Sequence, residues 1–231
     1  MRWWARLLVA LSGSSVALAQ APLPPDLKGA DKLAALVQRV TQVQAGITTL
    51  QARFEQRKTS RLLAEPTVSV GRFYYLSPDL VRWEYETPHP MTVVLAEGVA
   101  ITYRPAEKRA ERVEVGRLQR RVLRFVGAAE PLDRLKQNFS FTFRDPGDDS
   151  NYTLLLNPIS HLIKKRLRRV EVEIDRVRMM PVAVSYVEAD GDSVAYRFTD
   201  IVTNQPIEHA FFSLALPPDV QVVEVKLGSN E

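Results

Sequence analysis

Apolar residues recur along this chain with two different periods. Between residues 31 and 46 the spacing is three or four, at Leu33, Leu36, Val37, Val40 and Val43. This spacing predicts one amphipathic helix of about four turns, with Asp31 as its N-cap or first-turn acid and Gly46 as its stop. After Gly46 the apolar period becomes two, which is typical of β-strands.

Short alternating segments, separated by turn residues, fill most of the remaining chain. In "YYLSPDLVRWEYETPHP", residues 74–90, a Ser-Pro-Asp turn joins two strands, and the second strand alternates Val81, Trp83 and Tyr85 with charged residues. Gly71 is expected to form a bulge, and the Asp-Gly-Asp stretch at 190–192 is a strong hairpin signal. Further strands are expected at residues 50–56, 68–75, 92–95, 99–103, 109–115, 139–143, 152–156, 169–174, 182–187, 194–198 and 211–216.

Residues 116–126 interrupt the strand pattern. Leu118, Val122 and Phe125 recur at helical spacing, with arginines mostly on the opposite side. We therefore expect a second helix here and a short third one over residues 132–137. The whole pattern predicts an α+β, mainly β domain, with about ten to eleven antiparallel strands in a sheet that curls and two or three helices.

The N-terminus has the features of a secretory signal peptide. Arg2 and Arg6 precede a short apolar stretch that closes on Ala17-Leu18-Ala19, so we expect export with cleavage after Ala19. Residues 20–30 are Pro-rich and predict an extended linker, followed by a single domain over residues 31–231. No later segment is long and apolar enough to cross a bilayer. We expect the mature protein to be a monomer in the periplasm.

Composition narrows the classes of function. The chain has no cysteine, which excludes disulfides, thiol chemistry and cysteine-ligated metal. It has 31 Lys and Arg against 27 Asp and Glu, and loss of Arg2 and Arg6 with the signal peptide reduces this excess to two. The pI of about 9.4 is then a weak argument for nucleic acid, which an exported protein rarely meets.

No catalytic or metal-binding motif is present in the sequence. It lacks G-x-S-x-G, H-E-x-x-H, the Walker loop and G-x-G-x-x-G, and its three histidines are scattered. We therefore expect no catalytic residue, no metal and no cofactor. Glu84 and Glu86 share a strand face and could act as a carboxylate pair, but alternate polar residues are also what a half-solvated strand requires, and we favour that interpretation.

The run "KKRLRR", Lys164 to Arg169, has two interpretations. A polybasic segment attracts anionic head groups by ~1 kcal/mol per residue, so transient membrane contact is one. A solvated strand entry before Val170 and Val172 is the other. The pattern does not separate them.

Many large apolar residues fall on predicted strand faces. They exceed what the outer surface of a soluble sheet tolerates, so helices bury them permanently or they line a cavity. Aromatic stripes are usually core packing, and the pattern alone favours core. The residues are Phe54, Phe73, Tyr75, Val81, Trp83, Tyr85, Val93, Leu95, Tyr103 and Phe141.

The order of these features resembles the LolA family of periplasmic lipoprotein carriers. After the signal and the first helix come "LQARFEQ", "GRFYYLSPDLVRWEYETPHP", "DRVRMMPVAVSYVEADGDSVAYRFTDIVTNQPI" and "FFSLALPPDVQVVEV". Members of that family place a Trp-containing strand after a Pro turn and an Asp-Gly hairpin near the C-terminus. The similarity covers residues 31–225.

The resemblance implies an incomplete β-barrel with helices as a lid over a hydrophobic cavity. In that family the cavity takes the acyl chains of a lipoprotein from an inner-membrane ABC transporter and yields them to an outer-membrane receptor. The expected ligand-binding residues are Leu50, Phe54, Phe73, Tyr75, Val81, Trp83, Tyr85, Val93 and Leu95, with Leu118, Val122 and Phe125 on the lid helix.

One position departs from the family pattern. The archetypal carrier has an arginine immediately before the turn proline, where it holds the lid closed, and here Ser77 precedes Pro78. Arg82, directly before Trp83, could supply a guanidinium, but alternation assigns it to the opposite strand face from Trp83. Two other functions stay open: a module that senses lipid or lipoprotein in the envelope, and a carrier of glycolipid or another amphiphile. An enzyme on this fold is a weaker alternative.

Overall fold

The computed structural model describes residues 23–62, 65–115, 135–147 and 150–225. The described helices are α1 (Gly29–Ala45) and the four-residue α4 (His161–Lys164), and the 3-10 turns are η1 (Pro105–Glu107) and η2 (His209–Phe212). The strands are β1 (Thr49–Thr59), β2 (Thr67–Leu76), β3 (Leu80–Thr87), β4 (Met91–Ala96), β5 (Val99–Arg104), β6 (Arg109–Glu114), β7 (Phe139–Arg144), β8 (Tyr152–Pro158), β9 (Leu167–Ile174), β10 (Pro181–Glu188), β11 (Ser193–Thr203) and β12 (Gln221–Val225).

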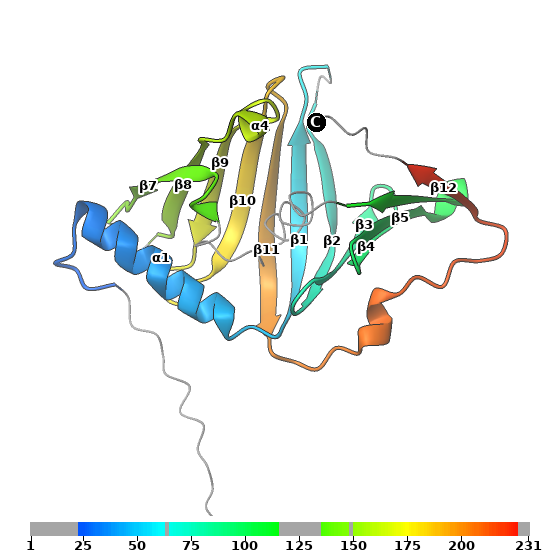
Figure 1. Ribbon diagram of the computed structural model, residues 1–231, viewed down its shortest axis with the longest axis horizontal. Helices are drawn as coiled ribbons and strands as arrows, with labels where there is room; N and C mark the ends of the chain where they lie inside the picture. The colour runs from blue at the N-terminus through cyan, green and yellow to red at the C-terminus, as the bar shows by residue number, and fades with distance from the viewer. Residues whose placement is uncertain (1–22, 63–64, 116–134, 148–149, 226–231) are drawn as a thin grey trace, which may run out of the picture.

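All twelve strands of the described residues belong to one open sheet. Their order is β12-β6-β5-β4-β3-β2-β1-β11-β10-β9-β8-β7, so β7 and β12 form its two edges and the sheet does not close (Figure 1). Neighbours pair antiparallel except β12, which runs parallel to β6. The mainly β, antiparallel, unclosed sheet was predicted correctly, whereas the expected ten to eleven strands are too few.

The expected strand at residues 211–216 is wrong. Residues 209–212 form η2 instead, and the closing strand is β12, further along the chain. Phe212 is buried against Leu80 and Val94 on the outer face of the sheet. The apolar residues whose pattern predicted a strand therefore anchor a segment that crosses this face. This segment passes over the far face of β3 and β4.

α1 begins at Gly29, two residues before the expected start, and ends at Ala45. Asp31 lies in the first turn as an acid, and the N-cap is Lys28, whose side chain makes no capping bond. Gly46 is the C-cap, as predicted. Within the described residues α1 is the only long helix, and no helix there is long and apolar enough to cross a membrane. The helices expected over 116–126 and, for the most part, over 132–137 lie outside the described residues.

The apolar stripe of α1 covers one half of the sheet. Leu36, Val37 and Val40 are buried against strands β8, β9 and β10, together with Leu154 and Val172. These side chains and their neighbours form the helix-covered cluster, whose other buried members include Leu156, Val170, Ile174 and Val184. We call the sheet face that packs on α1 the inner face.

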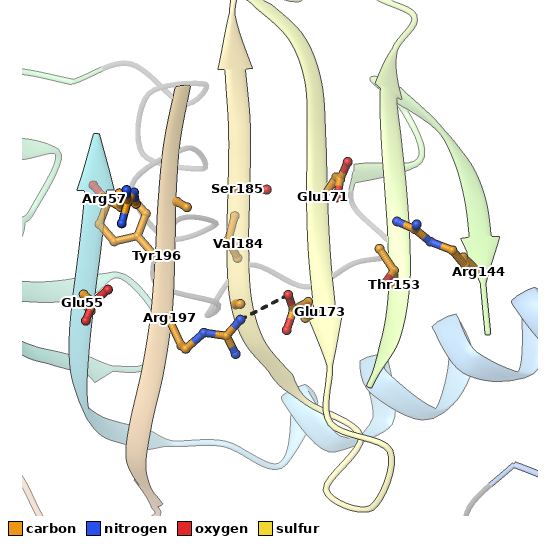
Figure 2. Close-up of a pocket in the computed structure, with 12 residues that line it drawn as sticks. Glu55, Arg57, Arg144, Thr153, Glu171, Glu173, Val184, Ser185, Tyr196 and Arg197 are labelled. Atoms are coloured by element: carbon orange, nitrogen blue, oxygen red, sulfur yellow. Dashed lines mark hydrogen bonds and ion pairs between the residues drawn. The ribbon is translucent and has the colours of Figure 1, made fainter. Parts of the chain in front are cut away.

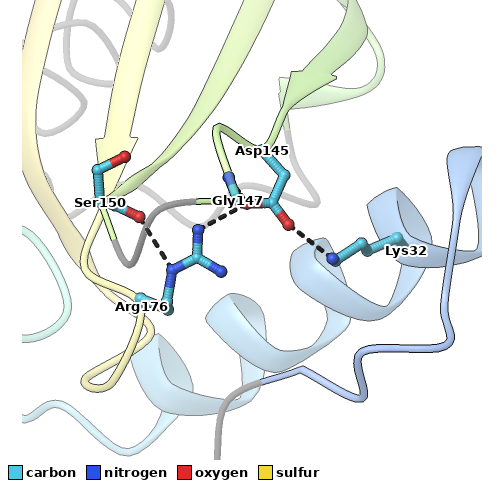
Figure 3. A network of polar contacts seen from close by, with 5 residues as sticks. All are labelled: Lys32, Asp145, Gly147, Ser150 and Arg176. Carbon is cyan, nitrogen blue, oxygen red and sulfur yellow. Dashed lines mark hydrogen bonds and ion pairs between the residues drawn. The ribbon is translucent and has the colours of Figure 1, made fainter.

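A polar network attaches the first turns of α1 to the loops around β7 and β9. Lys32 Nζ and Arg176 Nη2 each lie 2.6 Å from a different oxygen of Asp145, and Arg176 Nε donates to the Ser150 carbonyl at 2.9 Å (Figure 3). Burial opposes ionisation of Asp145, but the hydrogen bonds from Lys32 and Arg176 outweigh it and lower the pKa of this carboxyl to about 2.

Candidate functional site

The second half of the inner face is aromatic. Strands β1, β2, β3 and β11 place Phe54, Phe73, Trp83 and Phe198 on it with at most 5 % of each side chain exposed. The antiparallel register sets Phe73 opposite Trp83 and Phe54 opposite Phe198, which brings distant parts of the sequence onto one surface. We call these residues, with Tyr85 and Tyr196, the aromatic cluster.

Trp83 occupies the centre of the aromatic cluster. Its ring centroid lies 4.6 Å from that of Phe73, 4.9 Å from Phe54 and 5.3 Å from Tyr196. Tyr85 and Phe198 follow at 6.5 and 6.1 Å. The Phe54 ring meets Trp83 edge-on, at 73°, which is a favourable arrangement for aromatic pairs.

Glycine at position 71, which has no side chain, makes room for this arrangement. Gly71 lies beside the predicted bulge, since the register of β2 and β3 shifts between Val70 and Gly71. A Cβ on Gly71 would fall 2.0 Å from the Glu84 carbonyl oxygen and 2.8 Å from Cζ of Phe54. Glycine at this position therefore lets β3 and the Phe54 ring approach the β2 backbone.

The expected site residues on strands are brought together. Leu50, Tyr75, Val81 and Leu95 are buried in the same cluster as Trp83, and Val93 packs against it. Leu118, Val122 and Phe125 lie outside the described residues. The binding role of all twelve stays a prediction.

Two of the ten large apolar residues that the sequence placed on strand faces lie outside the cluster around Trp83. The tight turn at Glu97 and Gly98 pairs Val93 with Thr102, so Tyr103 falls on the outer face, and Phe141 packs against the helix-covered cluster. Conversely, Tyr196 and Phe198 were missed as site residues. Alternation in "VAYRF" indicates their strand, but only the pairing of β1 with β11 brings them to Trp83.

One end of the aromatic cluster carries hydroxyl groups. Gln56 Nε2 donates to the Tyr196 hydroxyl at 2.5 Å, and the Tyr85 hydroxyl lies 3.5 Å from it. Burial raises the pKa of Tyr85, raises that of Tyr196 well above its usual value, and raises that of nearby Tyr186 to about 12. These phenols therefore stay neutral at physiological pH and can exchange hydrogen bonds with a polar group.

Ser77, the residue before Pro78, makes a local backbone contact. The Ser77 N–H donates to the Thr48 carbonyl at 2.8 Å, in the link between α1 and β1. Arg82 lies on the outer face, as alternation predicted, where Nη1 donates to the Phe211 carbonyl at 2.8 Å and the guanidinium covers the Phe211 ring. Arg82 thus holds the segment that contains η2.

The carboxylates of β3 take part in ion pairs on the outer face. Glu84 lies 2.7 Å from Arg82, and Glu86 lies 3.0 Å from Arg72 and 3.5 Å from Arg53. This arrangement is that of a half-solvated strand. Among the residues that the structure describes, no three His, Asp or Glu side chains gather closely enough to hold a metal ion.

A hollow of about 330 Å³ lies on the outer face, over β7 to β11 and β1 (Figure 2). Small residues of β10 and β11 form its floor, and long charged side chains flank it, with Arg197 lying 3.4 Å from Glu173. Charged walls are unfavourable for an acyl chain. The outer-face residues that line it are Glu55, Arg57, Arg144, Thr153, Glu171, Glu173, Ala183, Ser185, Ala195 and Arg197. Val184 and Tyr196, which belong to the inner-face clusters, also border it.

One comparison with a solved structure supports this fold at low sequence identity. An uncharacterized conserved protein from Thermus thermophilus superposes with a TM-score of 0.52 at 14 % identity, over 84 % of this chain and 99 % of that one. A putative outer membrane lipoprotein-sorting protein domain from Vibrio parahaemolyticus gives 0.44 at 14 %, over 77 % and 94 %. A LolA superfamily protein from Nitrosomonas europaea gives 0.43 at 8 %, over 78 % and 97 %.

Sequence comparison identifies the family. No curated protein sequence matches the chain significantly. The family model described as "Outer membrane lipoprotein carrier protein LolA" matches residues 45–215, nearly three quarters of the chain and all the strands that carry the aromatic cluster. The chain therefore belongs to the LolA family.

Proposed function

We propose that this protein is a carrier that binds acyl chains of lipoproteins, or of related amphiphiles, at the aromatic cluster. The observation that carries the proposal is the position of this cluster. It lies on the inner face, beside the half that α1 covers, and within the 45–215 region that matches a lipoprotein-carrier family. Leu50, Val81 and Leu95 would extend the binding surface.

The composition of the surface suits reversible binding of hydrocarbon. Burial of each methylene contributes about 0.8 kcal/mol, so an acyl chain of about sixteen carbons gains on the order of 12 kcal/mol. Three such chains would exceed the practical ceiling of about 18–21 kcal/mol for noncovalent affinity. The binding energy therefore has to be partly offset in the loaded state, or the carrier could not release its cargo. Such an offset arises if the cargo separates aromatic side chains that pack on each other when the site is empty.

The cellular setting follows from the predicted signal peptide and the family. We infer that the protein works in the periplasm, receives cargo from an inner-membrane ABC transporter and passes it to an outer-membrane acceptor. It needs no metal or cofactor for this task, because transfer of an acyl chain between apolar surfaces makes and breaks no covalent bond.

Native mass spectrometry of protein isolated from its own periplasm tests the proposal. We expect a fraction of the molecules to carry an added mass that fragmentation assigns to an acylated species. A variant with Trp83→Phe, which keeps a ring in the buried cluster, should fold and carry less of that mass, whereas Lys108→Glu, on an exposed ion pair, should carry as much as wild type. Protein that is always free of lipid, and that extracts no lipoprotein from membranes holding the transporter, would contradict the proposal.

A further inference from the structure

The polybasic run forms an exposed turn at one end of the sheet. Lys164 ends α4, Lys165 and Arg166 follow, and β9 begins at Leu167. These three cations are exposed, and the ion pairs found among the described residues include none of them. The sequence from residue 150 to residue 170 contains no Asp or Glu, so the charge of this turn is not compensated within its own segment.

Hydrogen bonds join this turn to two hairpin tips. The Ala189 N–H donates to the Arg166 carbonyl at 2.9 Å, and the Arg168 guanidinium donates to the Ala189 carbonyl. In turn, Asp192 of the same β10–β11 tip accepts from the Arg61 N–H at 3.2 Å. The α4–β9 turn, the β10–β11 tip and the β1–β2 tip therefore form one continuous surface at the ends of the strands, at the top of Figure 1. We call this surface the edge, as distinct from the edge strands β7 and β12.

The same edge exposes large aliphatic side chains. Leu62, at the β1–β2 tip, is 93 % exposed, and Ile159, two residues before α4, is 52 % exposed. Lys58 and Arg61 add exposed cations next to Leu62. Asp190 and Asp192 lie between the two groups of cations, and Asp192 is engaged by Arg61. Cations with exposed aliphatic residues beside them are typical of a surface that meets a bilayer, because lipid accepts both.

We propose that this edge docks on anionic lipid membranes, with the cations at the head groups and Leu62 inserted at the interface. The chemistry recognised is a bilayer surface that carries phosphate groups with net negative charge. An acidic protein surface would attract the same cations but would leave exposed Leu62 without a role. This docking does not depend on which cargo the aromatic cluster takes.

Sedimentation with vesicles tests the proposal on the full mature chain. Vesicles of phosphatidylcholine with about a third phosphatidylglycerol should pull the protein into the pellet at low salt, and pure phosphatidylcholine should not. Removal of each cation near such a surface weakens binding about fivefold, equivalent to ~1 kcal/mol. Lys164→Glu with Lys165→Glu should therefore reduce binding at least about 20-fold.

Matched controls come from the other end of β9, roughly 25 Å away at 3.3 Å per residue. Lys28→Glu with Arg178→Glu makes the same change in net charge on exposed residues beside the Lys32–Asp145–Arg176 network. It should leave binding within about twofold of wild type if the effect is local. Leu62→Ser should weaken binding without changing its salt dependence, whereas Val177→Ser, on another exposed aliphatic residue, should not.

Two results would overturn the docking proposal. One is no binding to anionic vesicles at low salt, which would favour an acidic protein partner. The other is an equal loss for both charge-reversal pairs, which would mean that net charge alone acts. Carriage is read separately in the same assay, as lipid that appears in the supernatant with the protein, so failure of docking and failure of carriage are distinguishable.

Discussion

The two halves of the inner face are both apolar, yet they are built from different residues. The helix-covered cluster is mostly aliphatic and meets the stripe of α1. The aromatic cluster has six rings that pack on one another around Trp83. Aliphatic side chains of a helix and a sheet interdigitate to give a permanent core, whereas large flat rings offer area that a ligand can share.

From this difference we expect the two halves of the sheet to have different roles. Stability should depend most on the helix-covered cluster, and affinity for acyl chains on the aromatic cluster. Acid should destabilise mainly the helix-covered half, because the Asp145 network supports α1. Alkali should destabilise mainly the aromatic half, because it contains buried tyrosines.

The largest expected effect is on stability, from Leu154→Ala. Leu154 is fully buried beneath α1, so truncation leaves a cavity and should lower the free energy of unfolding by about 2–5 kcal/mol. Urea unfolding followed by circular dichroism measures it. The folded fraction should bind acyl chains with unchanged affinity, and loss of affinity without loss of stability would reverse the assignment of the two halves.

Trp83→Phe should act mainly on binding. The smaller ring keeps the aromatic packing, so we expect a loss of about 1–2 kcal/mol in stability and a drop of about tenfold in affinity for an acylated peptide, which corresponds to ~1.4 kcal/mol. Isothermal titration calorimetry measures the affinity. If stability falls as far as in Leu154→Ala while affinity is unchanged, Trp83 is ordinary core.

Asp145→Asn tests the attachment of α1. Its carboxyl has a lowered pKa of about 2, so it stabilises the fold above the unfolded-state pKa near 4 and loses this contribution as the pH falls toward about 2. We expect a loss of about 1 kcal/mol at pH 7, after allowance for solvent screening, and a weaker decline in acid. Asp219→Asn, on an exposed pair with Lys108, is the control and should change little. Identical acid profiles for wild type and Asp145→Asn would contradict this role.

The smallest effect is expected from Tyr196→Phe. Burial raises the pKa of Tyr196 above its usual value, so the folded state keeps the proton that the unfolded chain loses near pH 10, and stability should decline above about that pH. The variant should be slightly less stable at pH 7, because Gln56 loses its acceptor, and should decline less in alkali. Thermal unfolding from about pH 8 to 11 measures this. A wild-type protein whose stability is constant over that range would refute the prediction.

Local signals in the sequence predicted much of the sheet. The alternation of Val81, Trp83 and Tyr85, the bulge at Gly71 and the Asp-Gly hairpin each depend on neighbouring residues, and all were found. The prediction failed where alternation was ambiguous. Phe211 and Phe212 alternate poorly with polar residues and are held on the outer face by Arg82, a contact across 129 positions that no local pattern contains.

The site was predicted in part for the same reason. Residues of β1 to β4 follow one another in a meander, so their shared face could be read from period two. Tyr196 and Phe198 come from β11, which joins the meander only through β1, and neither period nor spacing specifies that partner. The helix-covered half was likewise unpredicted, because amphipathicity of α1 does not say which strands it covers.

Fluorescence of Trp83 tests the central claim most directly. Trp3 and Trp4 lie in the predicted signal peptide, so protein made without residues 1–19 has Trp83 as its single tryptophan. A lipopeptide with brominated acyl chains quenches tryptophan only at short range. We predict saturable quenching, absent with the same unbrominated lipopeptide. Binding without quenching, or no binding, would contradict the claim that acyl chains contact the aromatic cluster.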